Sequence, residues 1–232
     1  GEARQLIFEL GFDGRDLGVG AFRFKVDLEL SAALGIARDE DEAHRQLAQD
    51  LGFAVQVRQT GSLLRDYHTT QVPPTRRKTQ HATRKDELQA EKLATILSTR
   101  DYRCDAWSVI ALWQLDAGRD LLERLRAALR RPVYPLYLGR KACPLALPLE
   151  PQIVTVNTLA GAFEAVSFAS DGDETLQVLR SSSSDIHWDA HPRHGFSQVL
   201  QRTRRKDRIV SRRRWQFADR EEFMTRWSPP CT

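Results

Sequence analysis

Two short segments of the chain carry residues that could move protons or hold a phosphate. Tyr67 and His68 are adjacent. An imidazole exchanges protons near neutral pH, so this pair could serve as general acid and base in phosphodiester cleavage, with Lys141 stabilising the developing charge. Adjacent residues of a strand point to opposite faces, however, which favours one core residue and one that contacts a phosphate or a neighbouring protein. The sequence leaves both interpretations open.

The second segment is Gly139, Arg140 and Lys141. Glycine permits a close approach of the backbone to a ligand, and two adjacent cations can bracket a phosphate. A turn with solvated charges would have the same sequence. Binding is the interpretation we favour, and Pro144 and Pro148 would stiffen the loop that follows.

A third group of basic residues lies between positions 202 and 214, where Asp207 is the only acid. Its cations are Arg202, Arg204, Arg205, Lys206, Arg208, Arg212, Arg213 and Arg214. A guanidinium can bind phosphate through two hydrogen bonds or stack on a base. An acidic run occupies 39–42, so charge is segregated along the chain, and this favours a nucleic-acid partner over a generic solvated face.

Two further sets of residues near this stretch are of types that could bind a metal or a base. His187, His191 and His194 lie close to two aspartates, but a proline interrupts them and no cysteine is near, so the spacing matches no structural zinc pattern. We therefore predict no metal and no cofactor. Three tryptophans could stack on bases, although burial in the core is their commoner fate. They are Trp188, Trp215 and Trp227, and the sequence does not single out one of them.

The elements that position these residues predict an α+β fold. Apolar runs and alternation predict strands, and apolar residues at helical spacing predict helices. The predicted strands are 6–10, 53–57, 104–115, 153–156, 163–168 and 176–179. The predicted helices are 31–36, 41–51 and 121–129. Residues 62–67 are predicted to return from a turn at Thr60-Gly61.

The character of the chain changes between residues 72 and 99. Pro73-Pro74 breaks regular structure, and Arg76, Arg77 and Lys78 follow with few core residues, which predicts an exposed insertion. The order strand, helix, strand, insertion, strand, helix, strand is that of the split βαβ arrangement of ferredoxin-like and RRM domains.

We therefore expect an RRM-like domain over residues 1–150, with a thumb-like hairpin insertion at about 72–99. A β-rich C-terminal region over 151–232 is expected to pack on this domain.

Composition limits the class of protein further. The chain has 232 residues, 41% of them hydrophobic, which is enough for a substantial core. Its net charge is only +4, and its three cysteines include no CxxC pair, so a disulfide framework is not expected. No apolar run reaches the roughly 20 residues of a membrane span, and the N-terminus shows no signal pattern. We expect a cytoplasmic protein with no membrane contact.

The segments LRDYHTTQ at 64–71 and YPLYLGRKACPLALPL at 134–149 together resemble the CasD subunit, or Cas-five protein, of type I-E CRISPR Cascade. The resemblance covers about 51–149 and, less strongly, 213–223. It implies an RRM-like body with a long hairpin thumb at 72–99, which grips the five-prime handle of the guide crRNA and kinks the RNA near the handle–spacer boundary. Residues 11–30 depart from the usual family turn.

The resemblance also implies the partners of the chain. These would be the crRNA five-prime handle, the Cas-seven backbone subunits, the large subunit that reads the PAM, and target DNA through the complex. The sequence thus predicts a non-catalytic subunit, not an enzyme, that caps the guide RNA and supports antiviral DNA interference. The expected RNA-binding residues are Arg65, Tyr67, His68, Arg76, Arg77, Lys78, Arg140, Lys141, Arg204, Arg205, Arg208 and Arg213.

Two other functions stay open at this point. The first is a repeat-cleaving crRNA-processing endoribonuclease of the Cas-five type, which would use Tyr67, His68 and Lys141. The second is an unrelated basic structural protein, which would show no preference for the handle.

Overall fold

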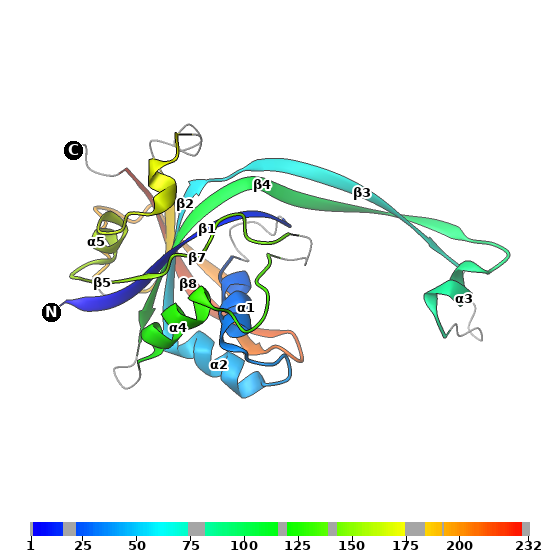
Figure 1. Cartoon of the computed structure of the whole chain (residues 1–232), viewed down its shortest axis with the longest axis horizontal. Coiled ribbons are helices and arrows are strands. Elements are labelled where there is room, and N and C mark those ends of the chain that lie inside the picture. Colours follow the sequence, from blue (N-terminus) through cyan, green and yellow to red (C-terminus); the bar gives the residue numbers. More distant parts are fainter. Residues whose placement is uncertain are drawn as a thin grey trace.

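The protein is a mixed α/β molecule built on a mostly antiparallel sheet, as the computed structural model in Figure 1 shows. The structure describes residues 2–15, 22–73, 82–115, 120–138, 143–174, 184–191 and 193–228. The strands are β1 Ala3–Arg15, β2 Leu51–Gln59, β3 Ser62–Val72, β4 Ala94–Gln114, β5 Gln152–Val156, β6 Ser184–Asp189, β7 Gln201–Ser211 and β8 Gln216–Trp227. The helices are α1 Phe22–Leu34, α2 Asp41–Asp50, α3 Arg84–Leu88, α4 Leu121–Arg130 and α5 Leu159–Glu164, with a 3-10 turn at Ala169–Gly172.

The strands lie in the order β5-β1-β4-β2-β6-β8-β7, and β3 pairs with β4 outside this path. The C-terminal strands therefore extend the same sheet: β5 pairs with β1 at one edge, and β6 pairs with β2 on the other side. Residues after 150 add strands at both edges of the sheet that the first half of the chain begins.

Helices cover both faces of the sheet. Leu6 and Phe8 of β1 belong to the core under α1, α2 and α4, whereas Ile7 belongs to a second core that includes Phe163 of α5. A strand buried on both faces is expected to be continuously apolar, which explains the run at 6–10. The helical stripe predicted at 121–129 is buried as well, in α4.

The longest strand, β4, changes partners along its length. Residues 107–113 lie between β1 and β2, residues 94–101 pair with β3 alone, and Tyr102 and Arg103 pair with both β1 and β3. Asp105 has a left-handed φ of 58° at the point where β4 changes partners. Gly61, on the other strand, has φ 71°, and a Cβ there would lie 2.3 Å from the carbonyl oxygen of Cys104, so this junction requires glycine.

The prediction that residues 62–67 return from a turn at Thr60-Gly61 is wrong. β2 and β3 both run antiparallel to β4 and pair with different halves of it, so the chain continues in one direction through Gly61. The hairpin is consequently longer than the predicted insertion, because its pairing runs without a break from Ser62 with Cys104 to Val72 with Ala94.

Two other element predictions differ from the structure. The strand predicted at 163–168 is wrong, because α5 ends at Glu164 and residues 165–168 belong to no strand. The Thr158 hydroxyl caps this helix by accepting a hydrogen bond from the Gly161 amide at 3.0 Å. The helix predicted at 31–36 is the end of the longer α1. The strand predicted at 176–179 lies outside the described residues.

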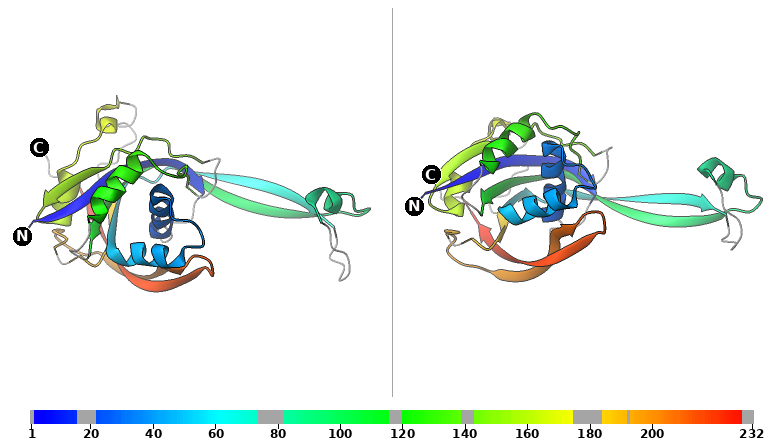
Figure 2. Two further views of the ribbon diagram at one scale, coloured as in Figure 1. Left: turned by 60° about the horizontal axis from the view of Figure 1, so that its bottom comes forward. Right: turned by 90° about the horizontal axis from the view of Figure 1, so that it is seen from below.

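The far edge of the sheet curls beneath the helices, so that β7 lies against α2 (Figure 2). The Ser211 hydroxyl of β7 donates a hydrogen bond to the Asp41 carboxylate of α2 at 2.6 Å. The Arg213 backbone amide donates to the same carboxylate at 2.9 Å. Both hydrogen bonds lower the pKa of Asp41.

A buried ion network joins α1 to the three C-terminal strands. Arg220 of β8 donates two hydrogen bonds to Asp207, at 2.7 and 2.9 Å, and one to Asp189 at 2.9 Å. Asp189 also accepts from Arg23 of α1, which in turn binds Asp27 at 2.9 and 3.0 Å. Since Asp189 links the two guanidinium groups, the network fixes α1 against the curled end of the sheet.

Candidate nucleic-acid interface

The β3–β4 hairpin projects far from the body and carries α3 at its tip (Figures 1 and 2). We call residues 62–104 the thumb. Thr83 caps α3 by accepting a hydrogen bond from the Asp86 amide at 3.2 Å. In the part of the chain that the structure describes, no second layer packs along the strands of the thumb, and their side chains are mostly exposed.

Large apolar residues are exposed on both faces of the thumb. Tyr67 and Leu97 share one face, and each is 72% exposed. Leu64 and Ile96 share the opposite face and are also exposed. A two-stranded ribbon is marginally stable by itself in water, and exposed apolar surface of this kind marks contact with a partner.

Three of the predicted RNA-binding residues lie on β3 of the thumb. Arg65 donates to Asp101 on the neighbouring strand at 2.9 Å, and this hydrogen bond raises the pKa of Arg65. His68 lies beside Asp66. Tyr67 and His68 point to opposite faces of the ribbon, as their alternation along the strand predicts. The two residues therefore do not converge on one phosphate.

Five predicted RNA-binding residues fall outside the part of the chain that the structure describes. They are Arg76, Arg77, Lys78, Arg140 and Lys141. The ends of the segment that holds Arg140 and Lys141 are nevertheless defined, because the Leu138 amide donates to the Cys143 carbonyl at 3.1 Å. Glu29 of α1 supports the approach to this segment by accepting from the Tyr137 amide at 3.0 Å.

The basic stretch on β7 faces acidic residues on β8. Arg205 donates to Glu222 at 3.1 Å, and the Arg204 guanidinium lies 3.8 Å from the Asp219 carboxylate. Arg202 pairs with Glu221 in the same way. Arg205, whose partner Glu222 is buried, is therefore a weaker phosphate ligand than the sequence suggests, whereas the exposed Arg204 keeps a hydrated charge. Arg208 is half-buried.

The turn between β7 and β8 differs from the strand that leads into it. It contains Arg212, Arg213, Arg214 and Trp215, and among the described residues neither Arg213 nor Arg214 has an ion-pair partner. Trp215 is 52% exposed, whereas Trp188 is 1% exposed and Trp227 packs against the second core. The structure therefore distinguishes the three tryptophans that the sequence could not.

A titratable carboxyl lies near this turn. Burial raises the pKa of Glu29 to about 7, although the hydrogen bond from the Tyr137 amide and the charges of Arg212 and Lys25 oppose the rise. Burial likewise lowers the pKa of Arg212.

Comparisons with known proteins agree with this architecture. Residues 30–221 match the model of a family described as CRISPR-associated protein (Cas_Cas5). The chain belongs to the Cas5 family. A curated relative, the CRISPR system Cascade subunit CasD of Escherichia coli (strain K12), is 30% identical over 205 residues, which cover 84% of this chain and 79% of the relative. The resemblance seen in the two sequence segments is confirmed.

Solved structures share the Cas5 fold. A chain of a structure titled "CRISPR RNA-guided surveillance complex" is similar with a TM-score of 0.59 and 18% identity, covering 100% of this chain and 92% of that chain. A second, titled "Crystal structure of Cas protein", has a TM-score of 0.51 and 19% identity, covering 97% of this chain and 94% of that chain.

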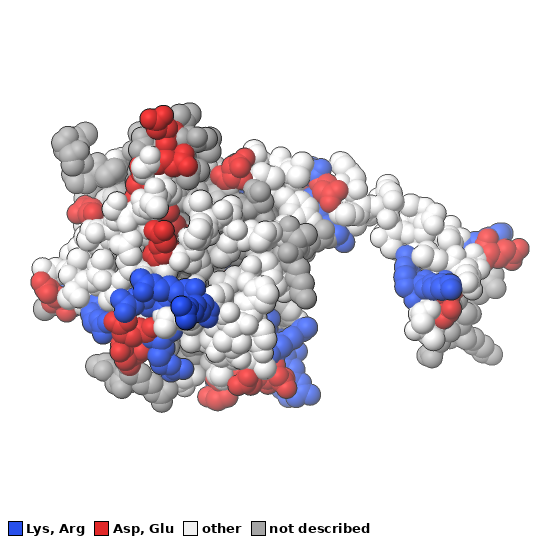
Figure 3. Space-filling model, in the orientation of Figure 1, with Lys and Arg blue, Asp and Glu red and all other residues white. Residues whose placement is uncertain are grey.

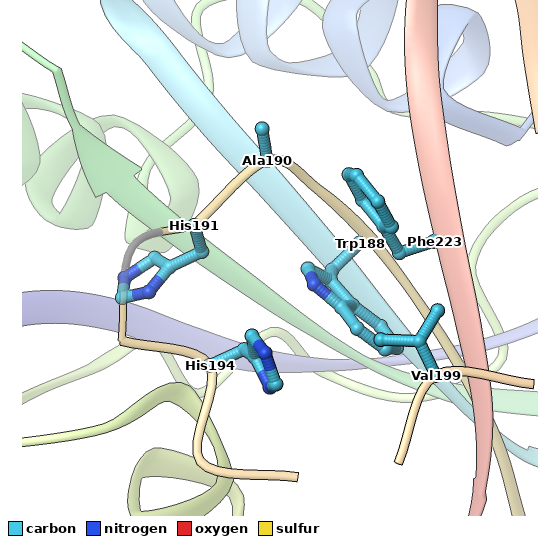
Figure 4. A pocket seen from close by; sticks show the side chains of 6 residues that line it. All are labelled: Trp188, Ala190, His191, His194, Val199 and Phe223. Atoms are coloured by element: carbon cyan, nitrogen blue, oxygen red, sulfur yellow. The ribbon is translucent and has the colours of Figure 1, made fainter. Parts of the chain in front are cut away.

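The histidine stretch of this Cas5 protein lines a cavity of about 540 Å³, shown in Figure 4. Its walls are Trp188, Ala190, His191, His194, Val199 and Phe223. The Nδ1 atoms of His191 and His194 each accept a backbone hydrogen bond at 3.1 Å, which leaves the outer ring nitrogens as donors. His187 instead lies 3.4 Å from the Glu222 carboxylate. Within the described residues no cluster of metal-ligating side chains occurs.

A basic surface over α4 contains none of the residues predicted from the sequence to bind RNA. Figure 3 shows basic side chains gathered there on the body of the Cas5 protein. Arg124 and Arg130 are exposed on this helix, while Arg126 pairs with Glu123 at 2.8 Å. Their spacing along an amphipathic helix could have revealed this outer face. In the described part of the chain, no helix is long and apolar enough to span a membrane.

Proposed function

We propose that this Cas5 protein is a non-catalytic subunit of a Cascade-type surveillance complex that binds crRNA and caps its five-prime handle. Its relative CasD, which is 30% identical over most of both chains, is named as a Cascade subunit. That relationship supports the same kind of assembly here.

The thumb is the observation that carries the proposal. A projecting ribbon with Tyr67 and Leu97 exposed on one face, and Leu64 and Ile96 on the other, needs partners along its length. Unpaired RNA bases offer planar apolar surface for one face, and a protein neighbour can cover the other. Arg65, which shares the face of Tyr67, would contact the RNA backbone there.

The body suits an RRM-like description, and we propose it for residues 1–156, because its fourth strand, β5, lies just beyond the expected boundary at 150; the later β-rich region extends the sheet. The strand order β5-β1-β4-β2, with helices crossing between β1 and β2 and between β4 and β5, is that of the split βαβ arrangement. An antiparallel sheet of this type supplies a rigid base for a binding hairpin.

The geometry of the thumb supports a binding role over cleavage. An endoribonuclease that used Tyr67 and His68 would need both side chains at one phosphate, and they lie on opposite faces of the ribbon. The proposed partners are accordingly those of a cap: the crRNA handle, the Cas-seven backbone subunits, the PAM-reading large subunit, and target DNA through the assembled complex.

The test is a binding and cleavage assay with labelled crRNA that carries either its own handle or a scrambled one. We expect tighter binding to the intact handle, no cleavage, and about fivefold or greater weakening in Tyr67→Ala, because one stacked base is worth at least about 1 kcal/mol. Leu64→Ala, on the opposite thumb face, is the matched control. Equal binding to both RNAs would overturn handle capping, and repeat cleavage lost in His68→Ala would establish the endoribonuclease.

A further inference from the structure

The turn between β7 and β8 presents an aromatic side chain in an unusual setting. Trp215 has a left-handed φ of 52°, a conformation that costs a bulky residue energy and that glycine or asparagine adopts more readily. Its amide donates to the Arg212 carbonyl at 3.4 Å, closing the turn. Strain of this kind concentrates at functional sites, and here it leaves half of an indole in solvent.

The exposed indole is held in place from behind. Its ring lies edge-to-face against Phe24 of α1, with 5.5 Å between ring centroids, and tilted against Phe217 at 6.2 Å. Phe24 and Phe217 are themselves in edge contact at 5.0 Å. The three rings form a supported platform, so little side-chain entropy would be lost when a ligand stacks on Trp215.

The charge beside the platform is positive and only partly compensated. Arg213 and Arg214 have no carboxylate at ion-pair distance among the described residues, in contrast to Arg204 and Arg205 on the strand. The Asp41 carboxylate lies close, and its two oxygens accept hydrogen bonds from the Ser211 hydroxyl and the Arg213 amide, so one negative charge faces the three arginines of the turn. Figure 3 shows basic side chains next to acidic ones at the lower right of the body, where the turn lies in Figure 1.

The turn also lies at the end of the body from which the thumb projects, in the views of both Figure 1 and Figure 2. A strand of nucleic acid that follows the base of the thumb would therefore pass near it. An exposed, supported indole flanked by arginines is the combination that binds unpaired nucleotides, because the ring stacks on a base and the guanidinium groups hold phosphates.

We propose that Trp215 is a base-stacking residue, and that the platform of Phe24, Trp215 and Phe217 with Arg213 and Arg214 binds one unpaired nucleotide of a single-stranded RNA. The inference rests on the proposed function only in taking that RNA to be the guide. Base stacking and phosphate binding are argued from the residues of the turn themselves. The three rings set the position of the base, and the arginines set the position of its phosphates.

The test is a double-mutant cycle between the full-length protein and a guide RNA in which one base at a time is replaced by an abasic site. We expect Trp215→Ala to weaken binding about 5- to 100-fold, Trp215→Tyr to retain most affinity, and one abasic position to weaken wild-type binding but not that of Trp215→Ala. Tyr134→Ala, which removes another exposed aromatic ring, is the control, and thermal unfolding checks that each variant folds.

The other outcomes separate this inference from the proposed function. If Trp215→Ala binds the guide as tightly as wild type, stacking is wrong; if the same variant then fails to join neighbouring subunits, the platform is a protein contact instead. If Trp215→Ala loses equal affinity for RNAs with intact and scrambled handles, and this loss is coupled to one abasic position, the platform is supported but handle capping is contradicted. A wild-type protein that binds no single-stranded RNA overturns both proposals.

Discussion

Arg220 in the body and Arg65 on the thumb are both strand arginines paired with carboxylates, yet their surroundings are opposite. The Arg220 side chain is 1% exposed and binds three carboxylates, whereas the Arg65 side chain is 55% exposed and binds one. Charge in the body is desolvated and satisfied internally, so it specifies how α1 meets the curled sheet. Charge on the thumb remains hydrated and can be redirected to a partner.

The largest expected effect is the loss of Arg220. Arg220→Ala leaves Asp189, Asp207 and Glu222 buried without their shared counter-ion, and we expect it to lower the free energy of unfolding by about 3–5 kcal/mol. Urea unfolding followed by circular dichroism measures this loss.

Arg65→Ala is the matched control for that experiment, since its exposed pair should leave the unfolding midpoint almost unchanged. Asp207→Asn, which keeps the shape of the site, provides a milder variant should Arg220→Ala fail to fold. Similar midpoints for Arg220→Ala and Arg65→Ala would remove the distinction between the two regions.

A smaller change in the free energy of unfolding is expected when the pH is varied, because Glu29 titrates. Its folded-state pKa of about 7 lies above its ordinary value of 4.5, so the folded protein holds a proton that the unfolded chain releases. The stabilisation from Glu29 is therefore complete below about pH 4.5 and is lost as the pH rises through 7. The loss is at most about 3 kcal/mol.

Unfolding measured between pH 5 and pH 8 checks this expectation. Glu29→Gln should flatten the decline in stability over that range, because an amide cannot release the proton. A wild-type protein whose stability does not fall between these values, or a variant with an unchanged slope, would show that Glu29 titrates normally.

Local pattern was enough to predict some of the fold from the sequence. The strand at 6–10, the helix at 121–129 and the opposite orientations of Tyr67 and His68 all follow from periodicity within one segment. The path through Gly61 was mispredicted because a turn that reverses the chain and a kink that continues it share the same residue type. Only pairing with the distant β4 decides between them.

The candidate site, too, could be predicted only in part from local sequence. The arginines of β7 were correctly identified as a basic stretch, but their neutralisation depends on residues 219–222, which β8 brings opposite them. The supported position of Trp215 likewise depends on Phe24, which is distant in sequence. The sequence shows directly which residues are charged or aromatic. Whether these residues are available to a ligand depends on cross-strand register and on helix packing.

The smallest expected effect separates the turn from the strand within one hairpin. Arg213 has no carboxylate partner among the described residues, while Arg205 lies 3.1 Å from the buried Glu222 carboxylate. If Arg213 holds a phosphate, Arg213→Gln should reduce the slope of log affinity against log salt by about 0.7, the value for one contact with single-stranded nucleic acid. Arg205→Gln should leave that slope nearly unchanged, because the Arg205 guanidinium is held by the buried Glu222 carboxylate. Titrations of single-stranded RNA at several salt concentrations measure both slopes, and a larger change in Arg205→Gln would place the RNA along β7 rather than at the turn.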